Sequence, residues 1–141
     1  MIVADTNVIA YLYINSDKSK HSAALARQDS DWAVPLLWSS EFRNVLSLYL
    51  KQGLMQIEEA LRIIKAAETL LAKKEYKIVS TDVIKLASQS NCSAYDCEFV
   101  ALAQKLDIKL VTSDKKVLKA FPEVAVSLET YTYAEDEKHS E

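Results

Sequence analysis

Short apolar runs alternate with amphipathic stretches along most of this chain. Each run ends in small or acidic residues, as the run from Ile2 to Ala4 does at Asp5-Thr6-Asn7. Apolar runs of this length, bounded by turn-forming residues, predict strands. Five strands are expected, at Ile2 to Ala4, Trp32 to Val34, Tyr76 to Val79, Lys109 to Thr112 and Val124 to Leu128.

The stretches between these runs have the periodicity of helices. Helices are expected at Val8 to Ile14, His21 to Gln28, Ser40 to Gln52, Ile57 to Lys74, Val83 to Gln89 and Ala94 to Leu106. Strands that alternate with helices, and that are nearly all apolar, predict a parallel sheet covered by helices on both faces. The expected fold class is therefore α/β.

The stretch from Ile57 to Lys74 has the clearest helical pattern and is expected to pack against the core. Its apolar stripe consists of Ile57, Ala60, Leu61, Ile64, Ala67 and Leu71. Gly53 lies between this helix and the preceding one, where a glycine adopts the left-handed cap conformation at little cost. Together the two features predict a helical hairpin.

Length and composition narrow the class of protein further. The 141 residues, half of them hydrophobic, suit one domain whose core needs no disulfide or structural metal. We expect this domain over residues 1–133, followed by an acidic tail at 134–141 with the composition of a disordered segment. The net charge of -3 argues against a DNA-binding protein held by charge alone. Two cysteines suit a reducing cytoplasm, and neither a secretory leader nor a membrane span is evident.

Several kinds of chemistry are excluded by what the sequence lacks. A single glycine rules out glycine-rich dinucleotide loops and Walker-type phosphate loops. Two cysteines and two histidines do not have the spacing of a four-ligand zinc site. No G-x-S-x-G motif accompanies His21, so a Ser/His hydrolase is dismissed. Any metal ion is therefore expected on oxygen ligands.

Four acidic residues are placed where a parallel sheet binds ligands, outside the carboxyl ends of its strands. Asp5 ends the first strand, and Asp114 opens a turn after the strand from Lys109 to Thr112. Glu41 and Asp96 lie near the starts of two helices and interrupt apolar stripes. The stripe of Glu41 is formed by Trp38, Val45 and Leu48, and that of Asp96 by Phe99, Val100 and Ala103.

Each of these acids also has a purely structural interpretation. Asp5 suits an N-cap, Glu41 and Asp96 suit first-turn acids, the latter in a capping box with Ser93, and Asp114 suits a turn. Four like charges on one rim nevertheless repel one another strongly, unless a divalent cation compensates them. Mg²⁺ or Mn²⁺ among clustered carboxylates can activate water for phosphodiester cleavage. Short polar neighbours could orient the carboxylates or bound water; they are Thr6, Asn7, Thr112 and Ser113.

Three segments of the sequence resemble PIN-domain nucleases, in particular the VapC-like toxins of prokaryotic toxin–antitoxin pairs. They read MIVADTNVIAYL, SSEFRNVL and SAYDCEFVALAQKLDIKLVTSDKKVL, and the likeness extends from Met1 to about Leu128. The resemblance implies a three-layer α/β/α fold with a parallel sheet of about five strands and a divalent-metal-dependent ribonuclease that uses Mg²⁺ or Mn²⁺. The implied acidic quartet, catalytic and metal-binding, is Asp5, Glu41, Asp96 and Asp114, supported by Thr6, Asn7 and Thr112.

The resemblance also implies partners, namely an RNA substrate and an inhibitory antitoxin protein. The apolar surfaces at Val8 to Ile14 and Ile57 to Lys74 are expected to receive the antitoxin or a second copy in a homodimer. Candidates for phosphate contact are Arg43, Lys115 and Lys116, which stand beside the motif acids.

Two further acids are weighed against the quartet. Glu98 is an additional acid of the third segment, and whether it joins the site stays open. Asp82 follows a predicted strand as Asp5 does, but the family pattern gives it no role, and it is interpreted as a helix-start residue.

Rival classes explain the acids less well. A haloacid-dehalogenase-like phosphatase needs a second Asp two residues after the first, where this chain has Asn7, and a phospho-receiver domain leaves Glu41 and Asp96 unexplained. Two alternatives stay open: a PIN fold that binds RNA or protein without cutting, and a PIN nuclease of RNA processing that is not a toxin. Four intact acids favour catalysis, because a non-catalytic descendant has no reason to keep a costly acidic cluster.

Overall fold

The computed structural model describes residues 1–132, so the predicted tail at 134–141 lies outside the described residues. Five strands form one parallel sheet in the order β3-β2-β1-β4-β5. Their bounds are β1 (Ile2–Ala4), β2 (Trp32–Pro35), β3 (Glu75–Tyr76), β4 (Leu110–Thr112) and β5 (Ala125–Ser127). The predicted parallel sheet is thereby confirmed.

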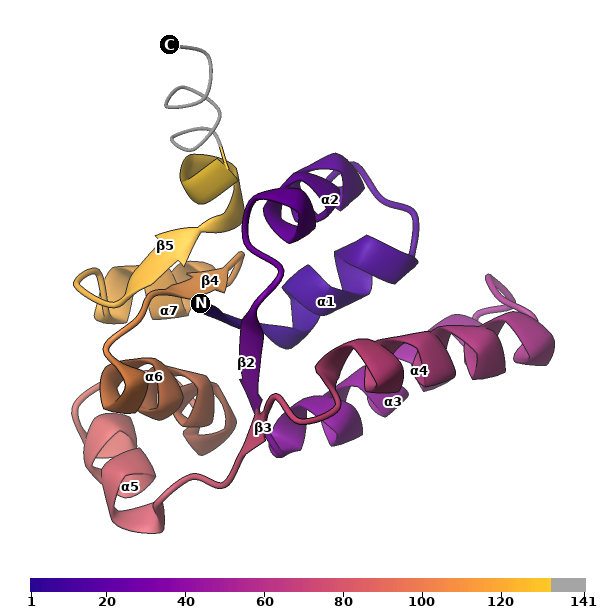
Figure 1. Ribbon diagram of the computed structural model, residues 1–141. Coiled ribbons are helices and arrows are strands. Elements are labelled where there is room, and N and C mark those ends of the chain that lie inside the picture. The colour runs from indigo at the N-terminus through magenta and orange to yellow at the C-terminus, as the bar shows by residue number, and fades with distance from the viewer. Residues whose placement is uncertain (133–141) are drawn as a thin grey trace, which may run out of the picture.

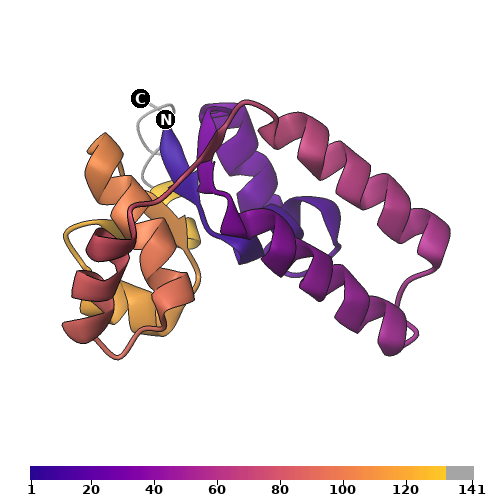
Figure 2. The ribbon, with the colours of Figure 1, turned by 90° about the horizontal axis from the view of Figure 1, so that it is seen from below.

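Helices cover both faces of this sheet. Their bounds are α1 (Thr6–Tyr13), α2 (Ser19–Gln28), α3 (Leu37–Lys51), α4 (Ile57–Leu71), α5 (Ser80–Ser88), α6 (Ala94–Leu106) and α7 (Lys115–Ala120), and residues 128–132 form one more helical turn. Figures 1 and 2 show α1 to α4 on one side of the sheet and α5 to α7 on the other. The three-layer α/β/α fold is confirmed.

The central strands carry the core. Every residue of β1 and β4 is buried, and α6 contributes a nearly continuous buried segment from Phe99 to Ala103 that packs on β1, β2 and β4. Because both faces of the sheet are covered, apolar side chains are stable on both sides of each strand. This packing fixes the carboxyl ends of β1 and β4 side by side. Among the described residues, no helix has both the length and the apolar character needed to cross a membrane.

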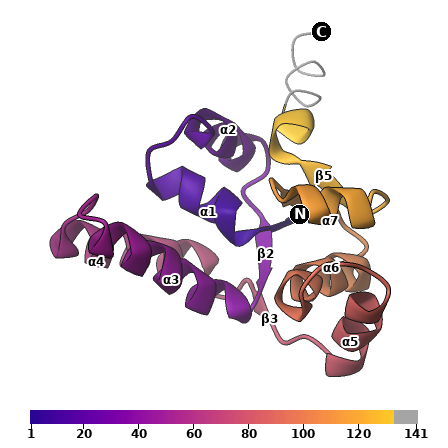
Figure 3. The same cartoon turned by 180° about the vertical axis from the view of Figure 1, so that it is seen from behind.

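A long helical hairpin extends from one side of the sheet (Figures 1 and 3). It turns at Gly53, whose φ is +73°. The N–H of Gly53 donates to the carbonyl of Leu50 at 3.1 Å, and the N–H of Leu54 donates to the carbonyl of Tyr49 at 2.9 Å. This is the bonding pattern of a Schellman cap, so the predicted glycine cap and hairpin are confirmed.

The helix faces of this hairpin differ from the prediction. In α4 the buried residues are Ala60, Ile63, Ala67 and Leu71, whereas Ile57 and Leu61 are more than half exposed. In α3 the buried residues are Trp38, Phe42 and Leu46, and Leu48 is 48% exposed. Both predicted stripes were therefore wrong in part, because each helix has more apolar positions than its contact with the core can bury.

The structure also differs from the prediction at β3 and at α7. β3 has only two residues, Glu75 and Tyr76, because its partner β2 ends at Pro35 and leaves no strand beside residues 77–79. Residues 115–120 form α7, where the sequence predicted only a turn after Asp114. Short helices of this kind lack enough turns to show a periodic pattern.

Candidate active site

One pocket, with a volume of about 200 Å³, brings the four predicted acids together. It lies at the carboxyl edge of the sheet, where Asp5 follows β1 and Asp114 follows β4. Glu41 reaches it from α3 in one helical layer, and Asp96 reaches it from α6 in the other. The remaining lining residues are Thr6, Asn7, Asn44 and Val45.

Two of the acids are N-caps as well as pocket residues. Asp5 caps α1, and its Oδ1 accepts the N–H of Thr6 at 2.7 Å. Asp114 caps α7, and its Oδ1 accepts the N–H groups of Lys116 and Val117 at 2.8 and 3.1 Å. The interpretation of Asp5 as an N-cap is thus confirmed, and the same residue also lines the pocket.

Asp96 also combines both features. It forms the predicted capping box with Ser93: its N–H donates to Ser93 Oγ at 3.0 Å, and its Oδ2 accepts the N–H of Ser93 at 3.3 Å. Since helix N-termini carry partial positive charge, the starts of α1, α6 and α7 offset part of the repulsion between these acids. Glu41 differs, because α3 begins at Leu37 and places this residue in the second turn rather than the predicted first.

Two buried threonines hold the acids in place. The hydroxyl of Thr112 donates to Asp5 Oδ2 at 2.5 Å, and Thr112 Oγ1 accepts the N–H of Asp114 at 3.0 Å. The hydroxyl of Thr6 donates to Glu41 Oε1 at 2.7 Å. One threonine therefore links the acids that follow β1 and β4, and the other links the start of α1 to α3.

Burial and mutual repulsion shape the electrostatics of the pocket. Burial raises the pKa of Asp5, the hydrogen bonds from Thr112 and Thr6 lower it, and the charges of Asp96 and Asp114 raise it again, with a net upward shift. Burial also raises the pKa of Glu41, as do the charges of Asp5, Asp96 and Glu98, against the hydrogen bond from Thr6. Burial first, and the surrounding negative charge second, thus make ionisation of both groups less favourable.

A pH dependence of stability follows from these shifts. Without a divalent cation, the free energy of unfolding contributed by Asp5 and Glu41 should fall as the pH rises through their raised pKa values. The folded state keeps these protons to higher pH than the unfolded state does, so it binds more protons in that window and loses stability there. The contribution of the two acids to the free energy of unfolding is fully present below about pH 4, the ordinary pKa of such side chains. Denaturation of wild type and Glu41→Gln in EDTA should show a shallower decline in the variant; equal slopes would contradict this account.

The donor set of the pocket fits a hard divalent cation. Its four carboxylates come with no basic side chain among the lining residues, and the ion pairs within residues 1–132 involve other acids, Asp29, Asp31 and Glu129. Carboxylate oxygens are the ligands that Mg²⁺ and Mn²⁺ prefer. In the described part of the chain, however, no three His, Cys, Asp or Glu side chains converge closely enough to hold an ion as they stand. Binding would therefore have to draw the acids together.

The other sequence candidates lie around the pocket rather than in it. Lys115 and Lys116 are exposed at the start of α7, directly after Asp114. Arg43 lines two other grooves and donates to Ser40 Oγ at 3.2 Å. Glu98 is half-buried on α6 and acts on the pocket through its charge on Glu41. The sequence did not single out Asn44, although it stands one turn after Glu41 on the same helix.

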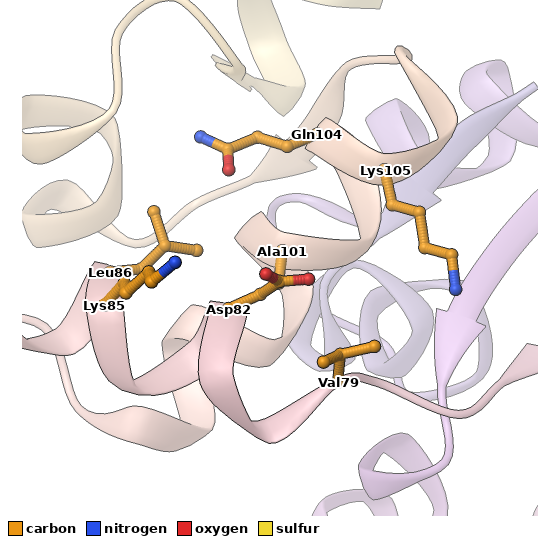
Figure 4. A pocket seen from close by; sticks show the side chains of 7 residues that line it. All are labelled: Val79, Asp82, Lys85, Leu86, Ala101, Gln104 and Lys105. Carbon is orange, nitrogen blue, oxygen red and sulfur yellow. The ribbon is translucent and has the colours of Figure 1, made fainter.

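Asp82 occupies a separate place. It lies in the first turn of α5, as predicted, but makes no cap hydrogen bond, since the N-cap residue is Val79. It lines a groove between α5 and α6 together with Lys85, Gln104 and Lys105 (Figure 4). No residue of this groove lines the acidic pocket.

Fold and site together define a three-layer α/β/α protein with an acidic pocket at the carboxyl edge of its sheet. The family model of the PIN domain matches residues 2–125. The chain therefore belongs to the PIN-domain family. Ribonuclease VapC3 from Pyrobaculum aerophilum is 30% identical to it over 124 residues, which cover 86% of this chain and 95% of that protein.

Solved structures share the fold at lower sequence identity. PAE2754 from Pyrobaculum aerophilum superposes with a TM-score of 0.76 at 19% identity, covering 94% of this chain and 87% of that chain. FitAcB from Neisseria gonorrhoeae gives 0.73 at 17% identity, covering 92% and 99%. A toxin-antitoxin complex from Klebsiella pneumoniae gives 0.65 at 17% identity, covering 91% and 98%.

Proposed function

We propose that this protein is a divalent-metal-dependent endoribonuclease and the toxin of a toxin–antitoxin pair. The observation that carries the proposal is the meeting of Asp5, Glu41, Asp96 and Asp114 in one pocket without a cationic partner among its lining residues. Such a cluster is costly for folding alone, and it has the chemistry that binds Mg²⁺ or Mn²⁺.

In this proposal the four carboxylates hold the cation and this chain's own residues set their positions. A bound divalent cation supplies a Lewis acid that lowers the pKa of water and neutralises charge on the reacting phosphate. Thr112 and the N–H of Thr6 fix both oxygens of Asp5. Glu41, whose pKa is raised by burial, is suited to accept a proton from the attacking water. Asp96 and Asp114 close the pocket from α6 and α7.

The relatives support RNA as the substrate and an antitoxin as the partner. Ribonuclease VapC3 is named for cleavage of RNA and matches this chain over 86% of its length. One structural neighbour is part of a toxin-antitoxin complex. The alternative of a PIN nuclease in RNA processing uses the same pocket and differs in the partner.

Incubation with a labelled RNA pool tests the proposed chemistry. Cleavage should require Mg²⁺ or Mn²⁺ and should stop in EDTA, because the acids need the cation to act on a phosphodiester. The same ions should raise the melting temperature, since a ligand that binds only the folded state stabilises it. This shift should shrink in Asp5→Asn, which removes one ligand charge.

Two other outcomes would change the assignment. Cleavage that persists in EDTA would overturn the metal-dependent mechanism. RNA binding without cleavage, at saturating Mg²⁺ and Mn²⁺, would favour the non-catalytic PIN module instead.

An apolar groove on the hairpin is the surface that best suits an antitoxin segment. It lies between α3 and α4, and its apolar lining consists of Leu46, Leu50, Ile57, Ala60, Leu61 and Ile64. Arg43 and Lys51 also line it, so its charged groups are both positive. A helical segment with apolar side chains and flanking carboxylates is complementary to this groove.

The groove gives a prediction for the partner. Leu61→Asp should abolish co-purification of a small protein with the tagged chain from its native cell, because it places a charge among apolar contacts. The matched control is Ile84→Asp on α5, which changes a side chain of similar exposure, 63% against 59%, and should leave the partner bound. Overexpression without the partner should stop growth.

If the tagged protein purifies alone and its overexpression does not slow growth, the toxin assignment is contradicted even though the fold is right. If Leu61→Asp instead halves the apparent mass of the purified protein, the groove is a contact between two copies of this chain.

A further inference from the structure

We propose that Asn44 is a substrate-positioning residue, whose side-chain amide donates a hydrogen bond to a phosphate oxygen of the RNA strand that crosses the acidic pocket. The inference rests on the proposed ribonuclease function and adds a residue that the sequence analysis did not single out.

The side chain of Asn44 is available to a ligand. It is exposed, lines the acidic pocket and stands on α3, one turn after Glu41. Within residues 1–132 its amide makes no hydrogen bond to the protein. An asparagine amide has two N–H donors, so both are free at the mouth of the pocket.

The wall of the pocket is negatively charged. Four of the eight lining residues are acids, and no lining residue is basic. A polyanionic strand that reaches the cluster therefore needs neutral or cationic donors close by, because most contacts that orient a nucleic acid go to its phosphates.

Side-chain donors near the pocket differ in whether they are free to bind a phosphate. Lys115 and Lys116 are exposed on the side of the pocket formed by α7. On the side formed by α3, Arg43 lines two other grooves and is bonded to Ser40. The hydroxyl of Thr6 is already bonded to Glu41. Of the α3 residues that line the pocket, Glu41, Asn44 and Val45, only Asn44 has a side-chain donor.

This placement indicates a direction for the strand. It would enter between α3 and α7, with one phosphate near Asn44 and another near Lys115 and Lys116, so that the phosphate between them lies over the acids. Binding by Asn44 then acts on substrate affinity and not on the chemical step.

The test compares Asn44→Ala with Gln104→Ala, an exposed amide on α6 that lines the separate groove of Figure 4. Asn44→Ala should raise KM for a single-stranded RNA about ten- to a hundredfold, the loss of one hydrogen bond to a charged group, with kcat within about twofold of wild type. Asn44→Asp should weaken binding more, because it adds a charge that repels phosphate. Gln104→Ala should match wild type, and Mn²⁺ should shift the melting temperature of all three variants as it shifts that of wild type.

Fluorescence anisotropy with the same labelled RNA gives a readout that does not depend on cleavage. In an Asp114→Asn background, adding Asn44→Ala should raise the Kd about ten- to a hundredfold. If this holds while the wild type cuts no RNA, the proposed nuclease function fails and the role of Asn44 stands. An unchanged Kd and KM, or an equal effect of Gln104→Ala, would overturn it whether or not the wild type cuts RNA. A fall in kcat alone would likewise overturn it and assign Asn44 to the chemistry.

Discussion

Replacing Asp114 by asparagine is expected to reduce RNA cleavage at least about 100-fold, since even residues that only support metal ligands cost ten- to a hundredfold. The fold should survive, because an asparagine Oδ1 can still accept the N–H groups of Lys116 and Val117 that Asp114 now caps. What the substitution removes is one negative charge of the pocket. Cleavage rates per folded molecule, with the folded fraction taken from circular dichroism, measure the effect.

The matched control for this substitution is Asp82→Asn. Both acids stand near the start of a helix that follows a strand, but Asp82 lines the groove between α5 and α6 and makes no cap bond. Its negative charge near the start of α5 is expected to contribute about 0.3–1 kcal/mol to the free energy of unfolding through the helix dipole. Cleavage should stay within about twofold of wild type. An equal loss of activity in both variants would mean that the quartet is misassigned.

The convergence of the acids could be read from the sequence because three of the four are tied to an element boundary. Asp5 directly follows an apolar strand, and Asp114 stands two residues beyond another. The carboxyl ends of neighbouring parallel strands meet at one edge, so their place in the same pocket follows from topology. Asp96 was marked by its capping box, a local signal that does not depend on the rest of the fold. Their roles in catalysis stay a prediction.

The details that the sequence could not supply depend on tertiary contacts. Leu61 and Ile57 continue the apolar pattern of α4, and only the position of α3 shows that they line an open groove and not the core. Periodicity reports which side chains are apolar, but not which of two apolar faces finds a partner. For the same reason the sequence pattern did not indicate Asn44, a polar residue whose proposed role depends on its place in the acidic pocket.

Thr112 was expected to orient the carboxylates, but its hydrogen bond to Asp5 depends on the pairing of β1 with β4, whereas the bond from the N–H of Asp114 is local. Thr112→Val keeps the shape of this fully buried side chain and removes both contacts. It leaves Asp5 Oδ2 without a donor and the N–H of Asp114 without an acceptor, while Asp5 Oδ1 keeps the N–H of Thr6. Such unpaired buried groups are expected to lower the free energy of unfolding by about 1–3 kcal/mol.

Thr112→Val should also change the pH dependence of cleavage. This effect distinguishes Thr112 from a buried threonine that only stabilises the fold. The hydrogen bond from Thr112 lowers the pKa of Asp5, so Thr112→Val should raise that pKa further and move the acid limb of the cleavage profile to higher pH. Thr112→Ser retains the hydroxyl and should restore the wild-type profile. The control is Thr132→Val, which removes another buried hydroxyl, bonded to the carbonyl of Leu128, and should reduce stability without moving the profile. If Thr112→Val leaves the profile in place at equal folded fraction, then Thr112 stabilises the fold without setting the ionisation of Asp5.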